Sequence, residues 1–144
     1  MRFTTKADYG LAALADIAIQ HEQGKKAVTA EIAQRQHISQ KYLEQILVQL
    51  RQANLIYASK GKNGGYRLKR AASNIRIAEV LDALDSTILA DAPEIDSDSG
   101  LRRSIKDCLW DKINGAMRDY TERMTLSELL ASGCCTDDGG TYVI

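Results

Sequence analysis

The residues best suited to catalysis or metal binding are three cysteines and two histidines, and their spacing favours neither task. Cys134 and Cys135 are adjacent while Cys108 stands alone, so they form no disulfide framework and we expect reduced thiols. His21 falls at the end of an expected helix and His37 in a turn, with no nucleophile or metal-ligand spacing around either. The sequence therefore predicts a protein that is not an enzyme and that uses no metal or cofactor.

The basic residues are gathered in one half of the chain. The formal net charge is zero, but residues 1–75 carry 12 Lys and Arg against 5 Asp and Glu, whereas residues 76–144 carry 7 against 14. The segment from Arg51 to Arg70 has six basic residues and no acidic one. This asymmetry is typical of proteins that bind nucleic acid or another polyanion. Composition alone leaves open a plain solvated charged face.

Length and composition suit one ordinary globular domain. The chain has 144 residues, of which 44% are hydrophobic and 26% charged, which argues against a disordered chain. No run approaches the ~20 apolar residues of a membrane span, and the first residues lack the apolar segment of a secretory signal. We therefore expect a cytoplasmic protein. The single proline, Pro93, and the few aromatic residues favour a mainly α fold.

Apolar spacing predicts a helix-turn-helix in the basic half. A first helix is expected over about residues 5–22, opened by a capping-box variant that starts at Thr5. Thr29 is expected to cap a short helix reaching about residue 35, and a tight turn follows at residues 37–38. Ser39 is then predicted to cap a helix over about residues 40–53. Any small helical bundle is the alternative.

The following segment predicts a two-stranded wing. Residues 55–59 have strand propensity, and residues 61–65 contain the Asn-Gly pair that favours a tight hairpin turn. Residues 66–70 alternate, which places Tyr66 and Leu68 on one face and Arg67 and Lys69 on the other. A basic hairpin after a helix-turn-helix indicates a winged helix.

The acidic half predicts a long helix that meets a second copy of the chain. A short helix is expected over residues 75–85, an acidic loop over 86–99, a helix over about 101–122, and a last short helix opened by a capping box at Thr125. The long helix would extend ~33 Å, more than a small winged domain needs. Its apolar face comprises Leu101, Ile105, Leu109, Ile113, Met117 and Tyr120. We expect a DNA-binding part at 1–74, dimerisation and regulatory helices at 75–132, and a flexible tail at 133–144.

The candidate DNA contacts lie on the second helix and the wing. In a helix-turn-helix the first residues of the second helix enter the major groove, and basic wing residues reach phosphates or the minor groove. Glu44 could accept from a cytosine amine and Gln45 could pair with an adenine edge. Packing of Tyr42, or pairing of Glu44 with Lys41, is the alternative. The predicted set is Arg2, Lys6, Gln40, Lys41, Tyr42, Glu44, Gln45, Lys60, Lys62, Gly64 and Arg67.

Three segments resemble the Rrf-two family of bacterial transcription regulators. They are MRFTTKADYG at residues 1–10, ISQKYLEQ at 38–45 and GKNGGY at 61–66. The resemblance covers nearly the whole chain and implies a dimeric winged helix that binds double-stranded DNA. Carried over by position, it makes Lys41, Glu44 and Gln45 base-contacting residues and Lys60 the basic wing residue.

Many members of that family hold an iron–sulfur cluster on three cysteines before the long helix, and this chain departs from them. Residues 86–104 contain no cysteine, so no cluster is expected. Segments TLSELL (125–130) and DGGTYVI (138–144) are closer to the cysteine-metabolism repressors. That branch implies cysteine synthase, O-acetylserine sulfhydrylase, as a partner, in whose active site the tail Tyr142, Val143 and Ile144 would dock. A redox- or iron–sulfur-responsive regulator of the same family is the alternative.

Overall fold

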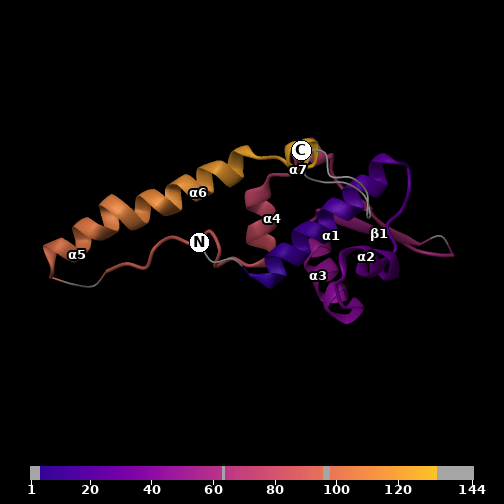
Figure 1. Cartoon of the computed structure of the whole chain (residues 1–144), viewed down its shortest axis with the longest axis horizontal. Coiled ribbons are helices and arrows are strands. Elements are labelled where there is room, and N and C mark those ends of the chain that lie inside the picture. The colour runs from indigo at the N-terminus through magenta and orange to yellow at the C-terminus, as the bar shows by residue number, and fades with distance from the viewer. Residues whose placement is uncertain (1–3, 63, 96–97, 133–144) are drawn as a thin grey trace.

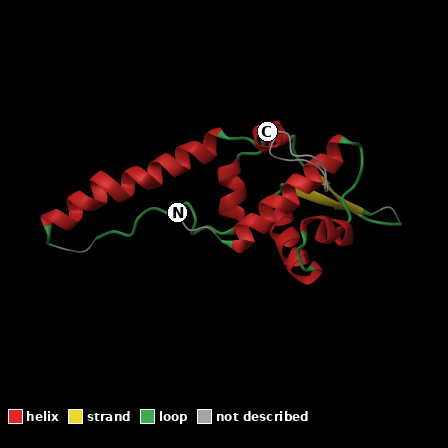
Figure 2. Ribbon diagram, viewed as in Figure 1, coloured by secondary structure: helices red, strands yellow, loops and turns green. Residues whose placement is uncertain are grey.

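The expected mainly α winged helix is the fold that the structure shows. The computed structural model describes residues 4–62, 64–95 and 98–132. Figures 1 and 2 show a helical body with a two-stranded wing at one end, and a long helix that extends away from it at the other. The helices of the body are α1 (Thr5–Glu22), α2 (Thr29–Gln36), α3 (Gln40–Gln52) and α4 (Ile77–Leu84). The strands are β1 (Ile56–Ser59) and β2 (Gly65–Leu68).

Helix α1 is the centre of the body because α2, α3, α4 and β2 all pack against it. Its side chains Leu14 and Ile17 are fully buried, as is Ile32 of α2. Helix α3 contributes a continuous apolar stripe, namely Leu43, Ile46, Leu47 and Leu50. The helix predicted over about residues 40–53 is therefore confirmed.

Gly10 sets how closely α1 approaches α4. A Cβ atom at this position would overlap the side chain of Leu84. A larger residue at this crossing would therefore have to displace the buried side chain of Leu84.

Two of the predicted caps are wrong and two are confirmed. Helix α1 is capped by Thr4, whose side chain accepts from the Ala7 amide, and not by Thr5. Helix α2 has Val28 at its cap position with no side-chain hydrogen bond, because Thr29 is already the first helical residue. The caps predicted at Ser39 and Thr125 are confirmed, since their side chains accept from the amides of Tyr42 and Glu128.

The wing is a short antiparallel hairpin tied to the body. Ile56 pairs with Leu68 at its base and Ser59 with Gly65 near its tip. The predicted alternation is confirmed, since Leu68 is buried and Tyr66 packs against the core. On its outer side β2 forms a bridge with the α1–α2 loop, in which Ala27 and Tyr66 exchange both backbone hydrogen bonds at 3.0 and 2.8 Å.

The long helix runs from residue 100 to 123 and contains one wide turn. It consists of α5 (Gly100–Ile105), the π-helical turn η2 (Lys106–Trp110) and α6 (Asp111–Arg123). Its α6 end is held to the body, because Arg118 donates to Asp82 of α4 at 3.1 Å and to the carbonyl of Leu89 at 3.1 Å.

The chain then returns to the body. The short helix α7 (Leu126–Ala131) follows α6, and its Leu126 is fully buried in the core. A 3₁₀ turn η1 (Ala72–Asn74) precedes α4, and the connection from α4 to α5 covers residues 85–99, whose described residues form no helix or strand. Division of the chain at residue 74 stays a prediction, and the proposed tail over 133–144 lies outside the described residues.

Candidate nucleic-acid interface

The first two turns of α3 present polar side chains to solvent. Gln40, Lys41, Glu44 and Gln45 are all exposed, whereas Leu43 and Ile46 between them are fully buried. The helix begins sharply at this end because the Ser39 side chain accepts from the Tyr42 amide at 3.1 Å. One face of α3 is therefore fixed to the core and the opposite face is free to contact another molecule.

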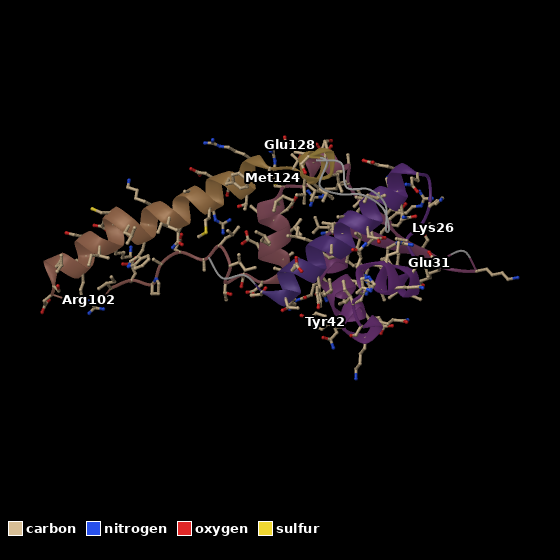
Figure 3. The ribbon with its side chains drawn as sticks, in the orientation of Figure 1. Lys26, Glu31, Tyr42, Arg102, Met124 and Glu128 are labelled. Carbon is tan, nitrogen blue, oxygen red and sulfur yellow. The ribbon has the colours of Figure 1, made fainter. Side chains whose placement is uncertain are left out.

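Tyr42 is oriented by an aromatic contact rather than left free. Its half-buried ring meets Tyr9 of α1 edge-on, with centroids 5.9 Å apart and an interplanar angle of 78°. Such a T-shaped pair is a favourable aromatic geometry. The packing role that the sequence left open for Tyr42 is the one that the structure describes. Figure 3 places this side chain near the start of α3.

A buried carboxylate on α1 holds α2, the helix that precedes α3. Asp16 is 4% exposed and accepts from Arg35 Nε at 2.9 Å and from a second Arg35 nitrogen at 2.7 Å. It also accepts from Gln36 Nε2 at 2.8 Å. The hydrogen bonds to Asp16 raise the pKa of Arg35 above its ordinary value. Sequence reasoning missed this group, because its members lie about 20 positions apart.

The wing presents cations beside this helical surface. Lys60 and Lys62 are exposed, while Arg67 is half-buried and donates to the carbonyl of Gly24 at 3.0 Å. At Gly64 a Cβ atom would lie 2.7 Å from the carbonyl oxygen of Ser59, so the turn leaves no room for a side chain there. Gly64 thus shapes the turn that presents the wing lysines.

Of the remaining predicted residues, one lies on α1 and the others lie outside the residues that the structure describes. Lys6 is half-buried on the first turn of α1. Arg2, Asn63 and the tail residues Tyr142, Val143 and Ile144 lie outside the described residues, as do Cys134 and Cys135. The structure therefore describes the candidate residues of α3 and of the wing. The hypothesis about the tail stays a prediction.

The part of the chain that the structure describes does not fit an iron–sulfur cluster. Within residues 4–62, 64–95 and 98–132, no three cysteine, histidine or acidic side chains lie together as metal ligands would. Cys108, the one cysteine in those ranges, is exposed on the η2 turn of the long helix. Clusters are held by several cysteine thiolates. The same ranges include no helix both long and apolar enough to cross a membrane.

Comparison with known proteins identifies the family. The model of the Rrf2 family, described as an iron-dependent transcriptional regulator, matches residues 3–132. The transcriptional regulator IscR of Cereibacter sphaeroides is 33% identical, over 90% of this chain and 87% of that protein. The IscR of Vibrio campbellii is 35% identical, over 90% of this chain and 77% of that protein.

Solved structures agree with this assignment. CymR, the global cysteine regulator of B. subtilis, superimposes with a TM-score of 0.80 at 26% identity, over 92% of this chain and 98% of that one. The IscR of T. potens gives a TM-score of 0.73 at 28% identity, over 92% and 88%. The exposed start of α3, the adjoining wing and these matches lead to one conclusion: the chain belongs to the Rrf2 family of DNA-binding transcriptional regulators, and not to a family of enzymes.

Proposed function

We propose that the protein is a homodimeric transcriptional repressor that inserts the start of α3 into the major groove of DNA. The observation that carries this proposal is the exposed polar face of α3, formed by Gln40, Lys41, Glu44 and Gln45 opposite a fully buried stripe. Amide and carboxylate side chains in such a position can pair with base edges. Lys60, Lys62 and Arg67 of the wing would contact phosphates or the adjacent minor groove.

The long helix supports a dimer. Residues 100–123 span about 36 Å and carry large apolar side chains that their own protomer leaves exposed. Leu101 is 72% exposed, Trp110 48% and Tyr120 65%, with Ile105, Leu109 and Ile113 each above 40%. Several large apolar side chains exposed on one helix are typical of a protein interface. A two-fold dimer would then place two α3 helices on two half-sites.

An apolar cavity at the root of the long helix supports the same dimer. It measures about 430 Å³ and lies between the start of α1, α4 and α6, with Leu11, Leu81, Ile88 and Met117 among its lining residues. Its lining continues to Tyr120 on the exposed face of the long helix. We assign its occupant as the long helix of the second protomer, since the cavity is continuous with the apolar face that a dimer would cover.

Selection of binding sites from random duplexes tests the DNA proposal. Purified full-length protein is mixed with a library of random duplexes, and bound molecules are sequenced over several rounds. We expect enrichment of one motif with two-fold symmetry and a half-site spacing near a whole number of helical turns. If no motif is enriched while the protein remains a folded dimer, then α3 does not recognise sequence.

For the signal that controls the regulator, the sequence relatives favour a redox- or iron–sulfur-responsive protein. The IscR proteins are 33–35% identical, and the family model is described as iron-dependent. The described residues do not supply a cluster ligand set. Anaerobic purification followed by iron and sulfide analysis decides the matter. Two or more irons per dimer would support a cluster sensor. A protein that contains no iron and binds DNA with the same affinity before and after exposure to oxygen would exclude it.

Control of cysteine or sulfur genes together with cysteine synthase is the second candidate. It is supported by the likeness to CymR, the global cysteine regulator of B. subtilis. The segment that the family resemblance implies would dock in the enzyme is Tyr142, Val143 and Ile144. Removal of Ile144 should abolish binding to O-acetylserine sulfhydrylase in a pull-down or by calorimetry. Equal affinity of the shortened and the complete chain would refute this partnership.

A further inference from the structure

A cationic surface extends from the wing residues described above to the α1–α2 loop. It is a cavity of about 790 Å³ between the α1–α2 loop, α2 and the wing. Its cationic lining residues are Lys25, Lys26, Arg35, Lys62 and Arg67, and Glu31 is the one carboxylate in the lining. Figure 3 labels Lys26 and Glu31, which come from the loop and from α2 and lie near the base of the wing. Sequence reasoning assigned Lys62 and Arg67 to DNA but gave no role to Lys25 and Lys26.

Positive side chains outnumber negative ones at this cavity, even when the ion pairs among its residues are taken into account. Arg35 pairs with Asp16 at 2.7 Å and lies 3.7 Å from Glu31, so one guanidinium faces two carboxylates and this group carries one net negative charge. Among the described residues, no ion pair joins Lys25, Lys26 or Lys62 to an acidic side chain. Lys25, Lys26, Lys62 and Arg67 therefore face one uncompensated carboxylate, which leaves an excess of three positive charges at the cavity. An anionic ligand would neutralise them.

The backbone around these lysines is held in place by hydrogen bonds. The loop residue Ala27 and the strand residue Tyr66 exchange both backbone hydrogen bonds, and Arg67 donates to the carbonyl of Gly24 at 3.0 Å. A Cβ atom at Gly65 would lie 2.9 Å from the carbonyl oxygen of Ala27, so the loop and the strand approach as closely as glycine allows. Lys25 and Lys26 therefore lie at a junction between the α1–α2 loop and β2 that backbone hydrogen bonds hold in place.

We propose that this junction is a phosphate-binding site that holds the DNA backbone beside the base-contacting surface of α3. The inference rests on the proposed function and extends the DNA-contacting surface to Lys25 and Lys26. A phosphate of a bound duplex fits the site better than a small free ligand, because small ligands are mostly enclosed by their pockets. Here Lys25 and Lys62 are exposed, and Lys62 belongs to the wing that the proposed function places on DNA.

The salt dependence of DNA binding tests the site. The double variant Lys25→Ala/Lys26→Ala is compared with the unchanged protein on a selected duplex and on a scrambled duplex of equal length. Each lost phosphate contact should lower the slope of log affinity against log salt by about 0.9. We expect a fall of about 1.8 to 3.6, because each protomer of the bound dimer loses one or two phosphate contacts. The fold loss of affinity should be the same on both duplexes, because phosphates carry no sequence information.

A matched control removes two charges elsewhere. Lys112→Ala/Arg123→Ala changes two exposed cations on α6, and its slope should equal that of the unchanged protein. Thermal melts of both variants establish that they fold. An unchanged slope for Lys25→Ala/Lys26→Ala, with the unchanged protein still selecting its motif, overturns this inference and leaves the proposed function intact. Failure of the unchanged protein to bind any duplex refutes the proposed function itself.

A second arm separates DNA phosphate from free phosphate. Inorganic phosphate is titrated into each protein at constant ionic strength and followed by amide chemical shifts. A DNA backbone site predicts no saturable shift of Lys25 and Lys26 below about 10 mM phosphate, since a lone anion forms few of the contacts of a duplex. Saturable binding below that concentration, together with an unchanged DNA slope in the double variant, would assign the site to a free phosphate ligand and overturn the DNA version.

Discussion

At the scale of single residues, Asp16 joins α1 to the first helix of the helix-turn-helix. It is 4% exposed and accepts three hydrogen bonds from α2, two of them from the guanidinium of Arg35. A bidentate pair of this kind fixes both distance and orientation. Because α3 follows α2 after one tight turn at His37, whose φ is 55°, the pair also limits the direction in which α3 points.

The first prediction concerns this carboxylate. Asp16→Ala should lower the free energy of unfolding by about 2 kcal/mol, because Arg35 and Gln36 lose their buried acceptor. Urea denaturation at a fixed protomer concentration measures the change. Glu31→Gln is the matched control, since that carboxylate is 60% exposed and 3.7 Å from Arg35, and it should change stability by less than about 0.5 kcal/mol. Equal losses in the two variants would contradict the role given to Asp16.

Local signals at single residues were predictable, and contacts between distant residues were not. Ser39 and Thr125 cap helices as expected because a cap is decided within three or four positions. The cap of α1 was misassigned by one residue, since Thr4 and Thr5 are chemically equivalent in the sequence. The pairing of Asp16 with Arg35 spans 19 positions and leaves no periodic trace.

At the scale of elements, the π-helical turn η2 explains the apolar pattern of the long helix. Leu101, Ile105, Leu109 and Ile113 recur every four residues, whereas an α-helix turns every 3.6 residues. The surplus would carry the apolar face around the helix, and one wide turn takes up about one residue of it. The sequence pattern predicted the helix and its apolar face, but the turn itself follows from the backbone.

The second prediction shifts the register of the long helix by one residue. Because the wide turn already takes up one extra residue, deletion of Asp107 should restore an ordinary helix and leave Leu101 and Ile105 on the same face relative to α6. Insertion of one alanine after Asp107 should instead rotate Leu101 and Ile105 by about 100° relative to α6, which is anchored to α4. We expect the insertion to weaken the dimer by at least about tenfold in sedimentation equilibrium, and the deletion variant is the control that should dimerise normally. An unchanged dimer in the insertion variant would show that the dimer does not need this alignment of the apolar face.

The wing also depends on a contact between elements that the sequence does not reveal. The hairpin itself was predictable from alternation and from the Asn-Gly pair. The bridge from Ala27 to Tyr66 was not, because two single residues carry no strand pattern. It is this bridge that brings Lys25 and Lys26 to the wing, which is why they were absent from the predicted DNA contacts.

At the scale of the whole molecule, the proposed DNA-contacting surface and the proposed dimer surface lie at opposite ends. The body buries a continuous core that includes side chains of α1, α3 and α7, whereas the long helix leaves its large apolar residues exposed. The uneven charge of the two halves follows the same division, since the wing and α3 belong to the basic half.

The third prediction separates these two ends. Leu109→Asp/Ile113→Asp should yield a folded monomer, because both side chains are more than 40% exposed in the protomer and are not part of its core. Light scattering should give half the mass of the unchanged protein, and affinity for a duplex with two half-sites should fall to that for one. Lys112→Asp on the same helix is the control. A variant that remains dimeric would place the interface elsewhere.

The central claim is that the exposed face of α3 recognises bases. Its most direct measurement is a competition between the selected duplex and its scrambled form, for the unchanged protein and for Glu44→Ala/Gln45→Ala. The account predicts that the variant loses at least about tenfold of its preference while its salt slope stays the same, since each good base contact contributes about 1–3 kcal/mol of discrimination. A variant that keeps the full preference for the selected duplex would contradict the account.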